Sequence, residues 1–209
     1  MANRVRVYID GFNLYYRALK GTPHRWLDPV KLAASLLGPD DTIDKARYFT
    51  ARVKARGGDI DGPRHQQIYL SALGTLPEIE IHYGRFLAKT KTRPLVAPPH
   101  NFVEVHDTEE KGSDVNLASH LLFDAWQGRM DTALVMSQDT DLLEPMRLLS
   151  QEIKMPIGLV WLDSTTPGKN HRNVVSFIRH ATPARLSAAQ FPERLMGKNG
   201  HVIAKPEKW

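Results

Sequence analysis

Short apolar runs rich in Val and Ile alternate along this chain with segments of helical periodicity. This alternation is typical of β-α-β units, which build a parallel sheet covered by helices. Runs of this kind predict buried strands at Arg4–Ile9, Lys45–Val53, Ala133–Ser137 and Pro156–Leu162. Charged residues interrupt a further run, Ile79–Phe86, which is therefore expected nearer an edge of the sheet.

Helices are expected between these strands. Asp28 as N-cap and Pro29 at the first helical position mark the start of one of them. Apolar residues recur on one face of Ser113–Trp126, which makes this segment a clear amphipathic helix. The expected helices are Phe12–Leu19, Pro29–Leu37, Asp61–Leu73, Ser113–Trp126 and Asp141–Gln151.

Two regions lack this regularity. Lys89–Asn101 is rich in Lys, Arg, Thr and Pro and is expected to be a mobile basic loop, followed by a short strand at Phe102–His106. The chain turns polar after Ala181. We therefore expect one α/β domain over residues 1–183 and a C-terminal tail over residues 184–209 that wraps around it.

Composition narrows the function. The 209 residues carry a net charge of +5 and include no cysteine, so disulfides, thiolate ligands and a cysteine nucleophile are excluded. No apolar run approaches the roughly 20 residues that a membrane-spanning helix needs, and the N-terminus does not resemble a signal peptide. We expect a cytoplasmic protein with no membrane partner.

Four carboxylates lie where a parallel sheet would gather them. Asp10 ends the first strand, Asp114 lies in the first turn of a helix, and Asp139 and Asp141 follow another strand. Carboxylates placed together repel one another unless a divalent cation lies among them, and Mg²⁺ prefers oxygen ligands. The pattern predicts a Mg²⁺ or Mn²⁺ site at Asp10, Asp114 and Asp139, and the positive net charge suggests a phosphodiester substrate.

Each of these positions also has a structural explanation. Asp114, Asp139 and Asp141 are each placed to cap a helix, which for any one of them alone is the favoured interpretation. Asn13 can share the pocket as a neutral ligand or a hydrogen-bond donor. Ser137 can bind a phosphate or satisfy backbone groups in its turn, and the sequence does not decide between these roles.

Basic residues around the acids are candidates for phosphate contacts. They include Lys89, Lys91 and Arg93 in the expected loop, and Lys111 just before Asp114, for which a solvated surface position is the favoured interpretation. Tyr15, Tyr16 and Trp26 are candidates for stacking on bases of RNA, although their spacing also suits core packing.

Three blocks of this sequence resemble the signature blocks of NYN domains, of the LabA-type branch in the PIN-like nuclease superfamily. They are VYIDGFNL at residues 7–14, EKGSDVNL at residues 110–117 and VMSQDTDL at residues 135–142. The resemblance implies a Rossmann-like three-layer sandwich with a mainly parallel sheet. It also implies a Mg²⁺- or Mn²⁺-dependent ribonuclease, with Asp10, Asn13, Asp114 and Asp139 in the active site and Asp141 as an adjacent acid. Gln138 departs from the glycine that is common in this family.

Two other functions are compatible with parts of the sequence. A non-catalytic PIN-like module that binds RNA or a protein is the main alternative, although the intact set of acids argues against it. A phosphatase of the haloacid-dehalogenase type is discounted because Ser137 and Gln138 separate the strand from Asp139. RNA is the expected partner. The edge strand and the tail are compatible with a homodimer, but no residue pattern demands one.

Overall fold

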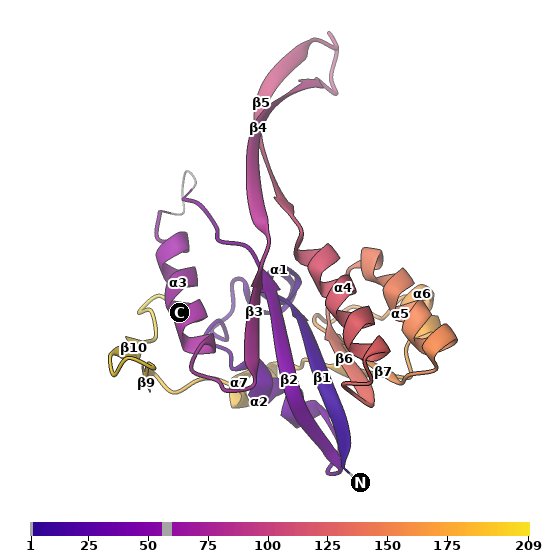
Figure 1. Cartoon of the computed structure of the whole chain (residues 1–209). Helices are drawn as coiled ribbons and strands as arrows, with labels where there is room; N and C mark the ends of the chain where they lie inside the picture. The colour runs from indigo at the N-terminus through magenta and orange to yellow at the C-terminus, as the bar shows by residue number, and fades with distance from the viewer. Residues whose placement is uncertain (1, 56–59) are drawn as a thin grey trace.

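A six-stranded parallel sheet forms the centre of the computed structural model, which describes residues 2–55 and 60–209 (Figure 1). The strand order is β3-β2-β1-β6-β7-β8, and each neighbouring pair is parallel. The strands are β1 (Asn3–Asp10), β2 (Asp41–Thr50), β3 (Ile79–Tyr83), β6 (Thr132–Met136), β7 (Ile157–Trp161) and β8 (Phe177–His180).

Helices cover both faces of this sheet, so the predicted three-layer α/β sandwich is confirmed (Figure 1). Alternate residues of β1 enter different cores, with Val7 and Ile9 on one face and Tyr8 on the other. The first face takes α1 (Gly11–Leu14), η1 (Tyr15–Leu19), α2 (Pro29–Leu36), α3 (Gly62–Leu73) and α7 (Pro183–Ala188). The second face takes α4 (Ser113–Trp126), η2 (Thr140–Leu142), α5 (Leu143–Arg147), η3 (Leu148–Ile153) and α6 (Lys169–Val174).

The strand order reverses between β1 and β6. Numbered along the chain within this sheet, the order is 3-2-1-4-5-6, the doubly wound arrangement of Rossmann-like folds. Open sheets of this kind bind ligands beyond the carboxyl ends of the strands at such a switch point. Asp10 is the last residue of β1, and Asp139 follows three residues after the end of β6.

An antiparallel hairpin projects from the domain where a mobile loop was expected (Figure 1). It consists of β4 (Arg85–Pro94) and β5 (Phe102–Lys111), paired from Arg85 opposite Lys111 to Pro94 opposite Phe102. The loop predicted over Lys89–Asn101 is therefore confined to residues 95–101, and the strand predicted at Phe102–His106 continues to Lys111. Lys91 bridges to Asp107 and Glu109 on the facing strand, and such pairs of opposite charge stabilise an antiparallel ladder.

The expected strand Ile79–Phe86 is split in two. β3 ends at Tyr83, and β4 starts at Arg85 in a different sheet. Gly84 lies at the break, where its N–H donates to Thr50 O at 2.7 Å. A Cβ atom at position 84 would lie 2.7 Å from Lys111 O. Only glycine therefore allows the backbone to pass this close to the end of β5.

The C-terminal segment packs on the first face of the sheet. Phe191 and Ile203 are buried in the same core as Trp26, and Trp209 packs beside that core. A small antiparallel pair, β9 (Arg194–Met196) with β10 (Val202–Ala204), precedes Trp209. Residues 184–209 thus cover part of the domain surface.

Candidate metal centre

Asp10 is 4% exposed and is fixed by two hydrogen bonds. Its Oδ1 accepts from the N–H of Asn13 at 2.9 Å, which caps α1, and its Oδ2 accepts from the hydroxyl of Ser137 at 2.9 Å. Burial raises the pKa of Asp10, while these hydrogen bonds oppose the rise. The carboxylate therefore has a fixed orientation, and its burial disfavours the ionised form.

Ser137 connects Asp10 to the turn that carries Asp139. Its side chain is buried, and its Oγ accepts from the N–H of Asp139 at 3.1 Å while donating to Asp10. Ser137 thus satisfies a backbone group in its turn, as one of its two predicted roles requires, and its contact with a phosphate stays a prediction. Asp139 itself caps η2 by accepting from the N–H of Asp141 at 2.9 Å.

Asp114 reaches the same place from the first turn of α4. Gly112 precedes that turn with φ of 101°, a conformation that favours glycine, and Ser113 Oγ donates to Glu110 at 2.6 Å. Burial, followed by the nearby charges of Asp10 and Asp139, raises the pKa of Asp114 to about 6. Burial is the larger cause of this rise, and the neighbouring carboxylates add to it.

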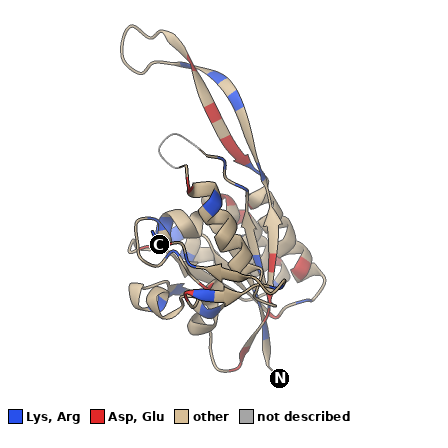
Figure 2. Ribbon diagram, turned by 90° about the vertical axis from the view of Figure 1, so that its left-hand side faces the viewer, with Lys and Arg blue, Asp and Glu red and all other residues tan. Residues whose placement is uncertain are grey.

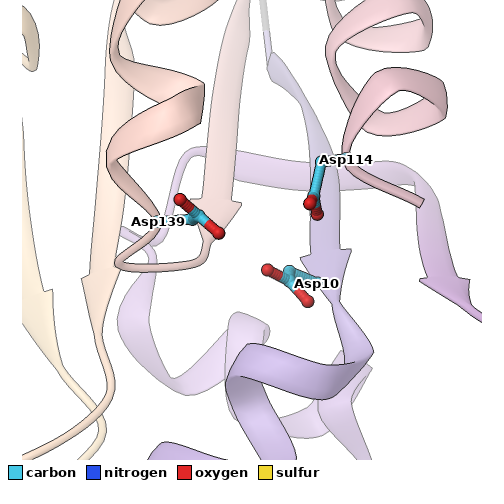
Figure 3. Close-up of side chains that lie close together, drawn as sticks. All are labelled: Asp10, Asp114 and Asp139. Atoms are coloured by element: carbon cyan, nitrogen blue, oxygen red, sulfur yellow. The ribbon is translucent and has the colours of Figure 1, made fainter. Parts of the chain in front are cut away.

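The three carboxylates point toward one another (Figure 3). One oxygen from each of Asp10, Asp114 and Asp139 lies within 4.8 Å of the others. Oxygens on opposite sides of a single bound ion would lie about 4 Å apart for Mg²⁺ and about 5 Å apart for a larger cation such as Ca²⁺. The donor set and its spacing therefore fit a hard divalent cation.

Asn13 and Gln138 lie next to the three aspartates and hold the turn that carries Asp139. Asn13 Oδ1 accepts from the N–H of Gln138 at 2.9 Å, so this oxygen holds the Asp139 turn. The Gln138 side chain accepts from the N–H of Leu162 at 2.9 Å and donates to Asp163 at 3.2 Å. Gln138 thus ties the turn after β6 to the residues that follow β7. Sequence reasoning missed Asp163, which carries no local signal.

Asp141 lies outside the group of three. It is exposed, and its charge is one of those that raise the pKa of Asp114. The proximity of Asp141 to the three aspartates leaves its predicted supporting role open.

The predicted basic contacts lie on the hairpin (Figure 2). Lys89, Lys91 and Lys111 each form an ion pair with Glu109. Residues alternate between the two faces of a strand, and Phe86, which lines the pocket beside the aspartates, lies on the opposite face of β4 from Lys89, Lys91 and Arg93. The hairpin therefore presents these three residues on the face that does not line the pocket.

A pocket of about 640 Å³ opens beside the three aspartates. Its walls include η1, α3, the base of the hairpin and Trp209. Trp26, expected as a base-stacking candidate, is fully buried instead, whereas Tyr15 and Tyr16 line the pocket.

Fold and site together define an α/β protein of the doubly wound class with a three-aspartate centre at its switch point. No protein-family model matches the chain. It is 29% identical, over 99% of its length and 75% of the relative's, to the 6-hydroxy-3-succinoylpyridine 3-monooxygenase HspA of Pseudomonas putida.

A solved structure shares the fold. The chain resembles a Vibrio parahaemolyticus protein of unknown function with a TM-score of 0.52 and 12% sequence identity, over 87% of this chain and 94% of that one. In the part of the chain that the structure describes, no helix is both long enough and apolar enough to cross a bilayer.

Proposed function

We propose that this protein is a metal-dependent ribonuclease that hydrolyses RNA phosphodiester bonds with Mg²⁺ or Mn²⁺ held by Asp10, Asp114 and Asp139. The observation that carries the proposal is the convergence of three carboxylate oxygens within 4.8 Å at the switch point of the sheet. The resemblance of the three sequence blocks to NYN domains supports the same conclusion. The proposed place of action is the cytoplasm.

The residues of the centre have two roles in this proposal: some bind the metal, and others hold the metal ligands in place. A divalent ion bound there would polarise a phosphate oxygen and lower the pKa of a water molecule. Asp10, Asp114 and Asp139 supply the ligand oxygens, and Ser137 and Asn13 hold two of them in place through the hydrogen bonds described above. We assign Asp141 the orientation of water next to the centre.

Cleavage of a labelled RNA that contains unpaired segments tests the proposal. We expect cleavage with Mg²⁺ or Mn²⁺ and none with a chelator. Asp10→Asn and Asp139→Asn should each lose at least about a hundredfold in rate, because even the outer partners of metal ligands contribute roughly 10- to 100-fold. Asp131→Asn is the matched control, because Asp131 pairs with Arg4 and lies outside the group of three aspartates. If RNA binds and no metal supports cleavage, the chain is instead a non-catalytic RNA-binding module.

A second candidate function is hydroxylation of a hydroxypyridine, favoured by the 29% identity to a protein named as a 3-monooxygenase. The donor set argues for the nuclease, because three carboxylates are a typical set for Mg²⁺ or Mn²⁺, whereas many non-haem iron oxygenases use two histidines and one carboxylate. Oxygen uptake with NADH, Fe²⁺ and 6-hydroxy-3-succinoylpyridine tests this candidate. Conversion that persists in Asp10→Asn would place the reaction elsewhere in the molecule.

A further inference from the structure

Aromatic side chains line the pocket that begins at the three aspartates. They come from segments far apart in the sequence, so no single amphipathic element explains their convergence. They include Phe12 and Tyr16 from α1 and η1, Tyr69 from α3, Phe86 from the hairpin, and Trp209.

Several of these rings keep part of their surface open. Tyr69 is buried and donates its hydroxyl to Leu27 O at 2.9 Å, which is a core role. Tyr16, by contrast, is 61% exposed, and Phe12, Phe86 and Trp209 are partly exposed. Apolar ring surface left open in a concave site is typical of small-molecule and cofactor sites, and about 640 Å³ lies within their usual range.

Both acidic and basic side chains line the pocket. The lining includes the acids Asp10, Asp114 and Asp139 and the bases Arg17, Arg25 and Lys54, of which Arg17 pairs with Asp163. The Arg25 guanidinium lies 5.7 Å from the Trp209 ring, donates through Nη2 to Lys208 O, and has a buried Nε without a hydrogen-bond partner among the described residues. Cations beside aromatic rings suit a ligand that is flat and also negatively charged.

We propose that this pocket binds a planar aromatic heterocycle that carries an anionic group, with Tyr16 and Trp209 as ring contacts and Arg25 as a contact for the anion. Binding of the ring and of the anion at Arg25 does not depend on the proposed ribonuclease function. Two sources share this chemistry: a nucleotide, in which a base is joined to phosphate, and a pyridine that carries a carboxylate.

Calorimetric titration of the full chain separates these sources. The probes are uridine 5′-monophosphate, ribose 5-phosphate as its counterpart without a base, and 6-hydroxy-3-succinoylpyridine, each measured with Mg²⁺ and with a chelator. None of the phosphates contains a phosphodiester bond, so cleavage cannot consume them. We expect at least one ring-bearing probe to bind at least fivefold more tightly than ribose 5-phosphate, whether or not metal is present.

Variants connect binding to the pocket. Tyr16→Ala and Trp209→Ala should each weaken the binding of the ring-bearing probe by roughly five- to a hundredfold, the range found when a stacking side chain is truncated. Trp126→Ala is the matched control, because Trp126 is 80% exposed on α4 and does not line the pocket. Tyr16 is mostly exposed, so its variant should fold even if Trp209→Ala does not.

The outcomes are distinct. Tighter binding of uridine 5′-monophosphate assigns the pocket to nucleotides, and tighter binding of the pyridine assigns it to small heterocycles; either supports the proposal. Equal affinities for all three probes, or no effect of either variant, would overturn it. If the protein binds a ring-bearing probe but cleaves no RNA, the ribonuclease proposal is contradicted and the proposal of a ring-binding pocket is still supported.

Discussion

At the scale of single residues, burial and the nearby carboxylates of Asp10 and Asp139 together raise the pKa of Asp114. Its pKa rises from 3.8 to about 6 on folding, so the folded protein holds this proton more tightly than the unfolded chain does. Its favourable contribution to folding is thus fully present below pH 3.8 and is lost as the pH rises through about 6. In metal-free protein at pH 8, Asp114→Asn should raise the free energy of unfolding by about 1–2 kcal/mol, a figure reduced for solvent screening at this half-buried site.

Denaturant unfolding of the metal-free protein at pH 4 and pH 8 measures this difference. The gain should vanish near pH 4, and Mg²⁺ should stabilise the wild type more than Asp114→Asn. Asp131→Asn provides a control of opposite sign. The ion pair with Arg4 lowers the pKa of Asp131 to about 2, so its loss should destabilise the protein at neutral pH. An Asp114→Asn protein that is less stable than wild type at pH 8 would contradict the charge crowding described here.

Gly11 is a second residue on which the centre depends. A Cβ atom at this position would lie 2.7 Å from the Tyr48 ring and 2.8 Å from Phe49 O, and the backbone oxygen cannot move aside cheaply. Gly11→Ala should therefore cost roughly 1–3 kcal/mol of stability, typical of overpacking, and should displace Asp10 next to it. Thermal unfolding and metal titration measure both effects. Gly128→Ala is a useful contrast, since it meets no atom within 4 Å and adds strain only through its φ of 61°.

The acids, Asn13 and Ser137 could be predicted from sequence, but the hydrogen bonds that join them across the sheet could not. Asp10 and Asp139 follow apolar runs, and the carboxyl ends of parallel strands meet at one edge of a sheet. The bond from Ser137 to Asp10 and that from Gln138 to Asn13 join residues 127 and 125 positions apart. No local pattern encodes such pairs, because they exist only once β1 and β6 lie side by side.

At the scale of elements, the hairpin shows where pattern reasoning fails. Its strands bury little, so they lack the apolar alternation that marks a strand beside a core. The stretch between Lys89 and Asn101 holds three prolines and several charges, which favours a loop on composition alone. Its pairing depends instead on cross-strand contacts such as that between Lys91 and Asp107, which connect residues on different strands.

Two basic residues near the end of β4, Lys91 and Arg93, are expected to make unequal phosphate contacts. Lys91 is already paired with Asp107 and Glu109, whereas Arg93 is exposed beyond those acids. If RNA contacts this face, Arg93→Ala should reduce the slope of log affinity against log salt by about one, and Lys91→Ala by clearly less. Affinity measured by anisotropy at several salt concentrations gives both slopes. Equal slopes in wild type and Arg93→Ala would remove Arg93 from the contacts with RNA.

At the scale of the whole molecule, the sequence reveals the layers more readily than their boundary at the C-terminus. The periodicity of apolar residues predicts the buried strands and amphipathic helices. Their order along the chain predicts a parallel sheet with helices on both faces. The segment after Ala181 is mostly polar, and its few apolar residues form no periodic pattern that would predict their burial. Phe191 and Ile203 are nevertheless buried in the core that contains Trp26.

This packing predicts that the C-terminal segment unfolds together with the sheet. Phe191 is 6% exposed, and its ring centroid lies 5.6 Å from that of Trp26. Phe191→Ala should therefore lower the free energy of unfolding by about 3–5 kcal/mol within a single cooperative transition. Denaturant unfolding followed by tryptophan fluorescence and by circular dichroism measures it, with Phe102→Ala, 71% exposed on the hairpin, as the near-neutral control. Two separate transitions, or an unchanged midpoint, would mean that residues 184–209 pack on the domain without contributing to its stability. A single transition at a lower denaturant concentration would mean that the pocket wall containing Trp209 unfolds only together with the sheet.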